Sequence, residues 1–386
     1  MRSRGRAGLE VSYSCQLVCQ LACLPHSPQL LRIMPTPTRR QFLIRSLAAA
    51  VAAAAVARPA VARQSASDRA VVKPQRLQPG AGVGLFSPAG ATYDPTDIEI
   101  VSDAVRALGL VPYRATHLLD RYGYLAGRDR DRAADINQLF ADPKIDLLLP
   151  IRGDWGCARL LPYLDYDSIR QNPKIVVGFS DLTALLLGIY AQAGLACFHG
   201  PNGFSSWREA QTASFRSVLF AGDRAPLANE RPSEDGDRLM QVKFRVQTVT
   251  SGIARGRLIG GNLSVLSSLI GSPYFPDPRG AILFVEDIGE PIYRIDRMLT
   301  QLSLAGILEQ LSGFVFGQCV NCGPSGGYGS LTLLEVVRDR IASLGIPAYC
   351  NAPIGHLENI VTLPIGTEVE IDSDRGRLVM LEAAVT

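Results

Sequence analysis

The chain has 386 residues, of which 39 are basic and 36 are acidic, for a formal net charge of +3. Residues 1–62 hold eight arginines and one glutamate, so the rest of the chain carries 31 basic against 35 acidic residues. No basic cluster interleaved with aromatic residues remains there, which excludes nucleic acid and an anionic membrane surface as expected partners.

The N-terminal region has the features of an export leader. The Thr-Arg-Arg-Gln-Phe-Leu stretch at 38–43 has the twin-arginine form, an alanine-rich apolar run follows over 44–57, and Ala60-Val61-Ala62 is a small-residue cleavage pattern. We therefore predict a leader and linker over 1–70, cleaved after Ala62 or after Ala57. The alternative is a low-complexity tail.

The leader predicts a protein exported to the periplasm. Arg45 and Arg58 interrupt the apolar run, so a membrane-spanning helix is not expected and contact with the membrane is limited to export. Met34 would begin a leader of ordinary length, so Met1 and Met34 both stay open as the start.

Beyond the leader, the length suggests two domains. Short apolar strands alternate with amphipathic helices, which predicts a mostly parallel, doubly wound sheet in an N-terminal domain over 76–203. The expected strands are 83–86, 145–151 and 174–177, and the expected helices are 96–108, 129–140, 157–164 and 184–190.

The second half predicts another α/β domain, over 251–386. Residues 204–250 are rich in charge, proline and glycine, so we expect a linker with one edge strand over 242–249. The expected C-terminal helices are 260–270, 292–304 and 331–344, the expected strands are 281–285 and 314–316, and 356–380 alternates as antiparallel strands would.

Ser180 lies where the strand 174–177 turns into the helix 184–190. Such a turn lifts a nucleophilic hydroxyl above the end of a sheet, and the N–H groups at the helix start can stabilise an oxyanion. The alternative is a serine that only caps the helix.

A nucleophilic serine needs a base and a group that orients it. His199 and His356 both lie in Gly/Pro-rich turns, and Glu286-Asp287 ends an apolar strand. From the residues alone, the two histidines could instead be structural turn residues, and Glu286-Asp287 could be a pair that caps the following helix.

Five cysteines remain outside the leader, too few for a disulfide scaffold. Cys319 and Cys322 form a C-x-x-C pair without a matching second pair, which favours two buried thiols over a metal site. A disulfide between them stays open.

Several motifs in one order make residues 80–384 resemble the LD-carboxypeptidase (murein tetrapeptide carboxypeptidase) family of serine peptidases. They are Gly-Leu-Phe-Ser-Pro-Ala at 84–89, Arg-Gly with the Leu-Leu-Pro-Tyr-Leu-Asp run within 152–165, Gly-Phe-Ser-Asp-Leu-Thr at 178–183, Gly-Pro at 200–201, Gly-Gly-Asn-Leu at 260–263, Phe-Val-Glu-Asp at 284–287, Gly-His at 355–356 and Thr-Leu-Pro-Ile-Gly at 362–366.

The resemblance implies a catalytic triad of Ser180, Glu286 and His356 in a cleft between the two domains, and makes His199 structural. It implies release of a terminal D-Ala from a murein tetrapeptide through an acyl-enzyme. We expect no metal ion and no cofactor, and a homodimer stays open.

Further residues are candidates for stabilising the oxyanion and for binding the substrate. The expected oxyanion donors are Asp181, Gly153 and Asp154, where Asp154 departs from the second glycine common in the family. For the substrate carboxylate, the candidates are Arg152, Arg257 and Asn262.

Two alternatives stay open. A microcin-immunity peptidase of the same family would use an aromatic stacking residue such as Trp207. A non-catalytic exported binding protein would keep the fold without the chemistry.

Overall fold

The computed structural model describes residues 70–224, 226–228, 239–241, 245–324 and 329–386. The predicted leader, with its twin-arginine pair and Ala62, lies outside the described residues. The described residues belong to one compact unit.

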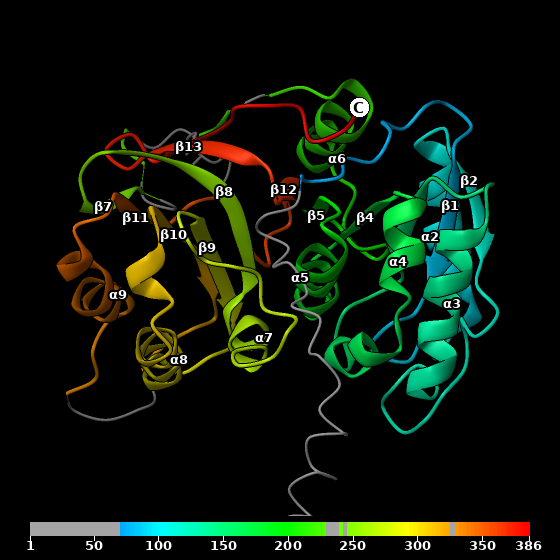
Figure 1. Cartoon of the computed structure of the whole chain (residues 1–386), viewed down its shortest axis with the longest axis horizontal. Coiled ribbons are helices and arrows are strands. Elements are labelled where there is room, and N and C mark those ends of the chain that lie inside the picture. The colour runs from blue at the N-terminus through cyan, green and yellow to red at the C-terminus, as the bar shows by residue number, and fades with distance from the viewer. Residues whose placement is uncertain (1–69, 225, 229–238, 242–244, 325–328) are drawn as a thin grey trace, which may run out of the picture. The chain divides into compact units, whose positions relative to one another are not determined.

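The first sheet has the strand order β12-β5-β4-β3-β1-β2, in which all strands except β12 run parallel. Every residue of β1, β3 and β4 is buried, as expected for a parallel sheet covered by helices on both faces (Figure 1). The order of the five parallel strands is that of a doubly wound sheet, which confirms the predicted fold class. Their bounds are β1 Gly82–Phe86, β2 Val111–Arg114, β3 Leu147–Pro150, β4 Ile175–Gly178, β5 Cys197–His199 and β12 Leu363–Ile365.

Helices connect these strands and begin at recognisable signals. Asp94 caps α2 by accepting a hydrogen bond from the Thr96 N–H at 2.8 Å, and Pro95 follows at the first helical position. The helices around this sheet are α2 Pro95–Ala107, α3 Asp129–Ala141, the 3₁₀ helix η2 Cys157–Tyr163, α4 Tyr166–Gln171 and α5 Leu182–Ala193.

The second sheet has the order β6-β14-β13-β8-β9-β10-β11-β7, with parallel central strands and antiparallel strands at both sides. This confirms an α/β C-terminal half with antiparallel strands. Its strands are β6 Leu227–Ala228, β7 Gln247–Thr250, β8 Ile253–Asn262, β9 Ile282–Ile288, β10 Gly313–Val320, β11 Ala348–Cys350, β13 Glu368–Asp372 and β14 Arg377–Met380, and its helices are α7 Leu263–Ser268, α8 Ile292–Leu304 and α9 Leu333–Ile341.

Two features depart from the expected organisation. The C-terminal strand β12 belongs to the first sheet, because Leu363 pairs with His199. The stretch expected to be a linker contains the helix α6 Glu209–Arg216 and the π-helix η3 Ser217–Ala221, whereas β7 is the expected edge strand. The domain boundaries at 76–203, 204–250 and 251–386 stay predictions.

Cys319 and Cys322 form a disulfide, so the expectation of two buried thiols is wrong for this pair. Asn321 adopts a left-handed φ of 55°, which reverses the chain at the end of β10 and brings the two Cα atoms within 5.3 Å. Cys157, Cys197 and Cys350 are buried free thiols.

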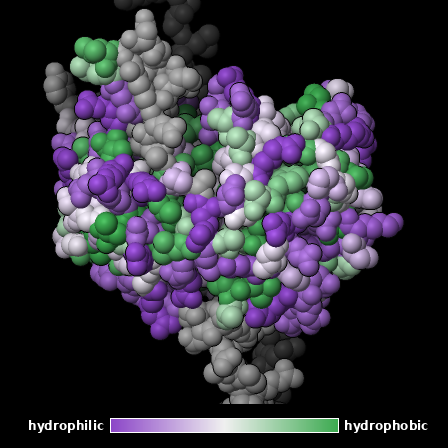
Figure 2. All heavy atoms as spheres, turned by 90° about the horizontal axis from the view of Figure 1, so that it is seen from above, coloured by the Kyte–Doolittle hydropathy of each residue, from purple (hydrophilic) through white to green (hydrophobic). Residues whose placement is uncertain are grey.

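The surface is mostly polar where it is in view. Figure 2 shows one face on which hydrophilic residues predominate and hydrophobic residues are scattered among them. Among the described residues, no helix combines the length and apolar character needed to cross a membrane.

Gly260 is the position in β8 where a side chain is least tolerable. Its φ is 147°, and a Cβ there would overlap the carbonyl oxygen of Phe284 on β9. We expect Gly260→Ala to lower the free energy of unfolding, measured by urea denaturation, by at least about 3 kcal/mol.

Gly271 provides the matched control. Its φ is also positive, at 84°, but nothing lies within 4 Å of a Cβ there. Gly271→Ala is expected to cost only about 1 kcal/mol, from backbone strain alone. Equal losses in the two variants would contradict the close approach of β8 to β9.

Candidate active site

Ser180 lies in a strained turn between β4 and α5. Its φ is 63°, in the left-handed region that a serine rarely adopts, which confirms the tight turn from strand to helix. The N-cap of α5 is Asp181 and has no side-chain capping bond, so Ser180 does not cap the helix. Gly178 permits the tight turn, because a Cβ there would lie 2.7 Å from Leu182.

Glu286 and His356 come together from different parts of the chain. The Nδ1 atom of His356 lies 2.8 Å from Oε2 of Glu286, whose side chain is completely buried at the carboxyl end of β9. Gly355 permits this approach, because a Cβ there would lie 3.2 Å from Glu286. A buried carboxylate at this distance can fix the orientation and tautomer of the imidazole.

The imidazole lies beside the serine turn. The ring of Phe179, the residue before Ser180, packs edge-to-face on the His356 ring with centroids 4.9 Å apart. Among the described residues, no hydrogen bond of 3.5 Å or less joins Ser180 to His356. The structure therefore brings Ser180, His356 and Glu286 into one region but does not form the hydrogen bond between Ser180 and His356. Catalytic hydrogen bonds are often longer in the absence of substrate.

The loop after β3 faces Ser180. A Cβ on Gly153 would lie 3.4 Å from the Ser180 hydroxyl oxygen, so the Gly153 backbone passes directly beside it. Within the described part of the chain, neither the Gly153 nor the Asp181 N–H donates a hydrogen bond to protein. Asp154 has a φ of 83°, which aspartate tolerates, and its carboxylate lies 3.1 Å from the Arg152 Nε.

Buried polar side chains hold these loops in place. The sequence indicated Asp181 only as a backbone oxyanion donor and gave no sign of Arg132. The Asp181 carboxylate accepts a hydrogen bond from the Cys157 N–H at 2.7 Å, and burial raises the pKa of Asp181. The buried Arg132 of α3 donates to the carbonyls of Pro88 and Gly156, and so joins the loops after β1 and β3. A buried arginine on an amphipathic helix gives no distinct sequence signal.

A second polar chain joins the serine helix to the strand of Glu286. The Asn262 N–H donates to the Thr183 hydroxyl at 2.9 Å, and the Asn262 side chain donates to Asp287 at 3.0 Å. Burial raises the pKa of Asp287 to about 6. Gly261 allows the contact, since a Cβ there would lie 2.5 Å from the Thr183 hydroxyl.

The three substrate-binding candidates lie in different places. Arg152 directly precedes Gly153 and is therefore close to Ser180, with its guanidinium 5.9 Å from the Phe204 ring centre. The Asn262 amide caps α7 and bonds to Asp287, so its side chain is engaged within the fold. Arg257 pairs in register with Glu368, five residues and roughly 16 Å along β8 from Asn262.

His199 is buried in the core behind the site. Its ring packs against the rings of Phe284 at 5.2 Å and Phe179 at 6.4 Å. Neither ring nitrogen has a hydrogen-bond partner among the described residues, and burial lowers its pKa to about 4. His199 is therefore neutral, and its buried ring nitrogens make no hydrogen bond to Ser180 or to any carboxylate in the described part of the chain that would orient the ring.

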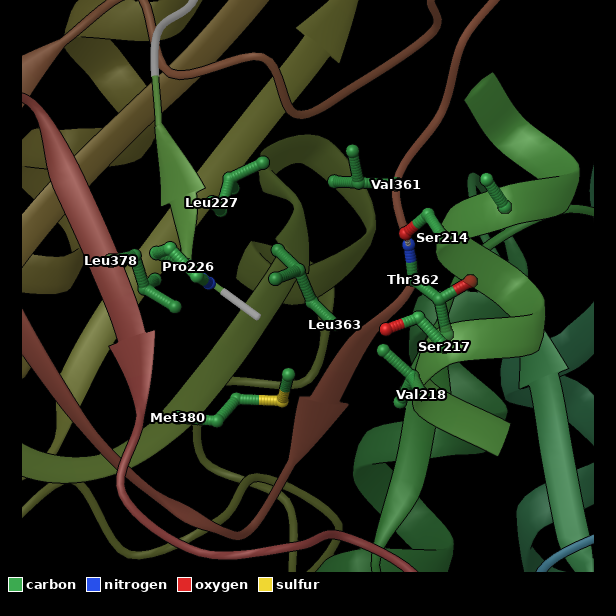
Figure 3. A pocket seen from close by; sticks show the side chains of 11 residues that line it. Ser214, Ser217, Val218, Pro226, Leu227, Val361, Thr362, Leu363, Leu378 and Met380 are labelled. Atoms are coloured by element: carbon green, nitrogen blue, oxygen red, sulfur yellow. Dashed lines mark hydrogen bonds between the residues drawn. The ribbon is translucent and has the colours of Figure 1, made fainter. Parts of the chain in front are cut away.

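A separate pocket of about 360 Å³ lies between α6, η3 and the strands β6, β12 and β14 (Figure 3). Val361, Leu363 and Met380 give it an apolar lining, and the Ser217 hydroxyl that borders it bonds to Asp223 at 3.0 Å. None of Ser180, Glu286 and His356 lines this pocket.

Comparison with known proteins places this geometry in a family. The N-terminal domain of LD-carboxypeptidases matches residues 83–200, and their C-terminal domain matches residues 255–371. The probable murein peptide carboxypeptidase of Bacillus subtilis is 33% identical over 81% of this chain and 95% of its own length. The murein tetrapeptide carboxypeptidase of Pseudomonas aeruginosa is 32% identical over 78% of this chain and 97% of its own.

Solved structures agree. The microcin C7 self-immunity protein MccF bound to glutamyl sulfamoyl guanosine superposes with a TM-score of 0.73 at 27% identity, covering 81% of this chain and 99% of the other. The muramoyltetrapeptide carboxypeptidase of Oxalobacter formigenes gives a TM-score of 0.65 at 26% identity, covering 78% and 97%. The chain therefore belongs to the LD-carboxypeptidase family of serine-type hydrolases.

Proposed function

We propose that this protein hydrolyses the L,D-peptide bond that releases the terminal D-Ala from murein tetrapeptide stems, with Ser180, His356 and Glu286 as its triad. The observation that carries the proposal is the 2.8 Å contact of His356 with the buried Glu286, beside the strained turn of Ser180. The relatives named as murein peptide carboxypeptidases support the substrate class.

The mechanism follows from the chemistry of these groups. His356, oriented by Glu286, takes the proton of the Ser180 hydroxyl, whose oxygen attacks the scissile carbonyl carbon. The N–H groups of Gly153 and Asp181 stabilise the oxyanion. The C–N bond then breaks, His356 returns its proton to the departing D-Ala amine, and water hydrolyses the resulting ester on Ser180.

A carboxypeptidase must also recognise a free terminal carboxylate. Arg152 is the charged candidate next to the nucleophile, because it directly precedes Gly153, whose backbone passes beside the Ser180 hydroxyl. Its planar guanidinium suits a carboxylate in two-point contact. The Asp154 carboxylate partly neutralises the charge of Arg152, which favours release of the product over tight binding.

The two alternatives have less support. The Trp207 indole N–H donates to the Gly203 carbonyl at 2.8 Å, and its ring packs on Phe215 at 5.3 Å, so the residue belongs to the fold rather than to an open stacking surface. Trp207, the aromatic residue that would have favoured a microcin-immunity activity, is therefore not available as an open stacking surface. The family assignment makes the protein an enzyme, so the non-catalytic binding protein is wrong.

We also propose that the enzyme acts outside the cytoplasm. The twin-arginine leader motif is the basis, and the Cys319–Cys322 disulfide is compatible with an oxidising compartment. Murein stems are present there.

Ser180→Ala should lower kcat/KM on a murein tetrapeptide by at least about 1000-fold, because the attacking oxygen is lost. The assay is mass spectrometry of the peptide, which loses one D-Ala. Glu286→Gln should also lower the rate by roughly 100-fold or more, since the amide does not stabilise the imidazolium. Unchanged turnover in Ser180→Ala, with a native circular dichroism spectrum, would exclude the proposed nucleophile.

His199 provides a test of which histidine is the base. In the unfolded chain it takes up a proton near pH 6.5, whereas in the fold it stays neutral down to a pKa of about 4. The unfolded state thus binds more protons between these values, and the stability falls as the pH is lowered through them, by up to about 3 kcal/mol.

His199→Leu should remove that part of the pH dependence while leaving the activity within about tenfold of wild type. Urea denaturation at pH 4.5 and 7.5 measures the first effect, and turnover measures the second. Loss of activity as complete as in Ser180→Ala would point to His199, rather than His356, as the base.

Arg39→Lys combined with Arg40→Lys should retain the protein in the cytoplasm at its unprocessed mass, because the twin-arginine pair is what the export receptor reads. Fractionation followed by intact-mass measurement shows the location and the cleavage site. Export and trimming of the double variant, or a wild type never trimmed near Ala62, would contradict the leader assignment.

A further inference from the structure

Tyr124 and Trp155 form an exposed aromatic corner near the candidate active site. Trp155 is 66% exposed and Tyr124 is 60% exposed, and their ring centroids lie 6.3 Å apart with the planes at 87°. A right-angled pair leaves the face of one ring and the edge of the other open to a ligand. Exposed large aromatic side chains that cluster in this way mark binding surfaces.

Backbone hydrogen bonds fix this corner relative to the nucleophile. The Ala91 N–H donates to the Tyr124 carbonyl at 3.0 Å, and the Gly90 N–H donates to the Gly153 carbonyl at 3.0 Å. Gly153 passes beside Ser180, and Trp155 is two residues further along the same loop. Trp155 therefore lies in the same loop as the proposed oxyanion donor Gly153, and Tyr124 is tied to that loop through Ala91 and Gly90.

The ring faces of the aromatic corner are not covered by any arginine side chain that the structure describes, whereas those of two neighbouring tyrosines are. The guanidinium of Arg121 lies over the Tyr93 ring at 5.2 Å, and that of Arg128 lies over the Tyr122 ring at 5.3 Å. No arginine of the described residues covers Tyr124 or Trp155 in this way, and neither the Tyr124 hydroxyl nor the Trp155 indole N–H has a hydrogen-bond partner there. The corner thus offers an apolar ring face flanked by two unused polar groups.

We propose that this corner binds the amino-sugar ring to which a murein stem peptide is attached. A pyranose ring has a face of C–H groups that packs on an aromatic ring, and a rim of hydroxyl and acetamido groups that can bond to a phenol and an indole N–H. The inference rests on the proposed function, because it places the sugar end of that same substrate.

The length of the substrate fits this placement. The stem is joined to its sugar at the N-terminus, and three residues precede the scissile bond, a span of at most roughly 11 Å before the lactyl link. Trp155 lies within roughly 7 Å of Gly153 along the backbone, and its side chain extends further. One extended stem can therefore join the corner to Ser180.

The first experiment compares kcat/KM of the mature enzyme on the free tetrapeptide and on the same peptide carrying the GlcNAc–MurNAc disaccharide. We expect the sugar-bearing substrate to be preferred at least tenfold, mainly through a lower KM, and the ratio to fall at least fivefold in Trp155→Ala and in Tyr124→Ala. Tyr113→Ala is the matched control, because this exposed tyrosine lies beside Gly82 at the opposite end of β1 and should keep the preference.

The second experiment needs no hydrolysis. The chain has two tryptophans, so in Trp207→Phe the fluorescence reports Trp155 alone. Titration with the GlcNAc–MurNAc disaccharide should shift that emission saturably, and Tyr124→Ala should weaken the apparent affinity at least threefold. A saturable shift without cleavage of either peptide would uphold the sugar site and reject the proposed function.

Equal kcat/KM values for the two substrates in wild type, or no fluorescence change up to about 10 mM disaccharide, would overturn the sugar site. A shift produced by guanosine monophosphate but not by the disaccharide would also overturn it in favour of a nucleobase. Light scattering that shows a dimer lost in Trp155→Ala would overturn it in favour of a second copy of the chain.

Discussion

The active-site region depends on the hydrogen bonds that run from Thr183 through Asn262 to Asp287. Thr183 lies in the first turn of α5, shortly after Ser180, and Asp287 follows Glu286 on β9, so this chain of bonds joins the helix that follows the proposed nucleophile to the strand of the second sheet that carries Glu286. These groups are buried, and a buried polar group without a hydrogen-bond partner raises the free energy of the fold. Arrangements that break these bonds are therefore disfavoured. Gly261 makes it sterically possible.

The two sheets have different tasks around that link. The first sheet carries the proposed nucleophile Ser180 and the proposed oxyanion donors, Gly153 in the loop after β3 and Asp181 at the start of α5. The aromatic corner consists of Tyr124 in the loop after β2 and Trp155 in the loop after β3, and Arg132 and the Gly90–Gly153 bond join the loops after β1 and β3. The second sheet supplies Glu286, and the turn after β11 supplies His356. Because parallel strands end at one edge of each sheet, the proposed mechanism places the substrate along these edges, in contact with the aromatic corner, Ser180 and His356 in turn.

The sequence predicted those features that depend on local pattern. The apolar strands, the amphipathic helices and the turn at Ser180 all follow from residues close together in the chain. Pairing between distant segments did not follow: the pattern predicted a strand near Leu363 but not its place in the first sheet, and C-x-x-C spacing did not reveal the turn at Asn321 that closes the disulfide. Thr183 and Arg132 act through partners far away in sequence, so residue type alone gave no reason to single them out. Asp287 was noted with Glu286 at the end of an apolar strand, but its bonds to Asn262 and to the Ser264 N–H were not predicted.

The central claim is that Ser180 is the nucleophile and that His356 activates it. A fluorophosphonate, which reacts with activated serines, followed by peptide mapping of the modified protein tests this claim most directly. The account predicts one modification, on Ser180, that murein tetrapeptide slows and that His356→Ala abolishes. Modification of another residue, or full peptidase activity in protein whose Ser180 is completely modified, would contradict it.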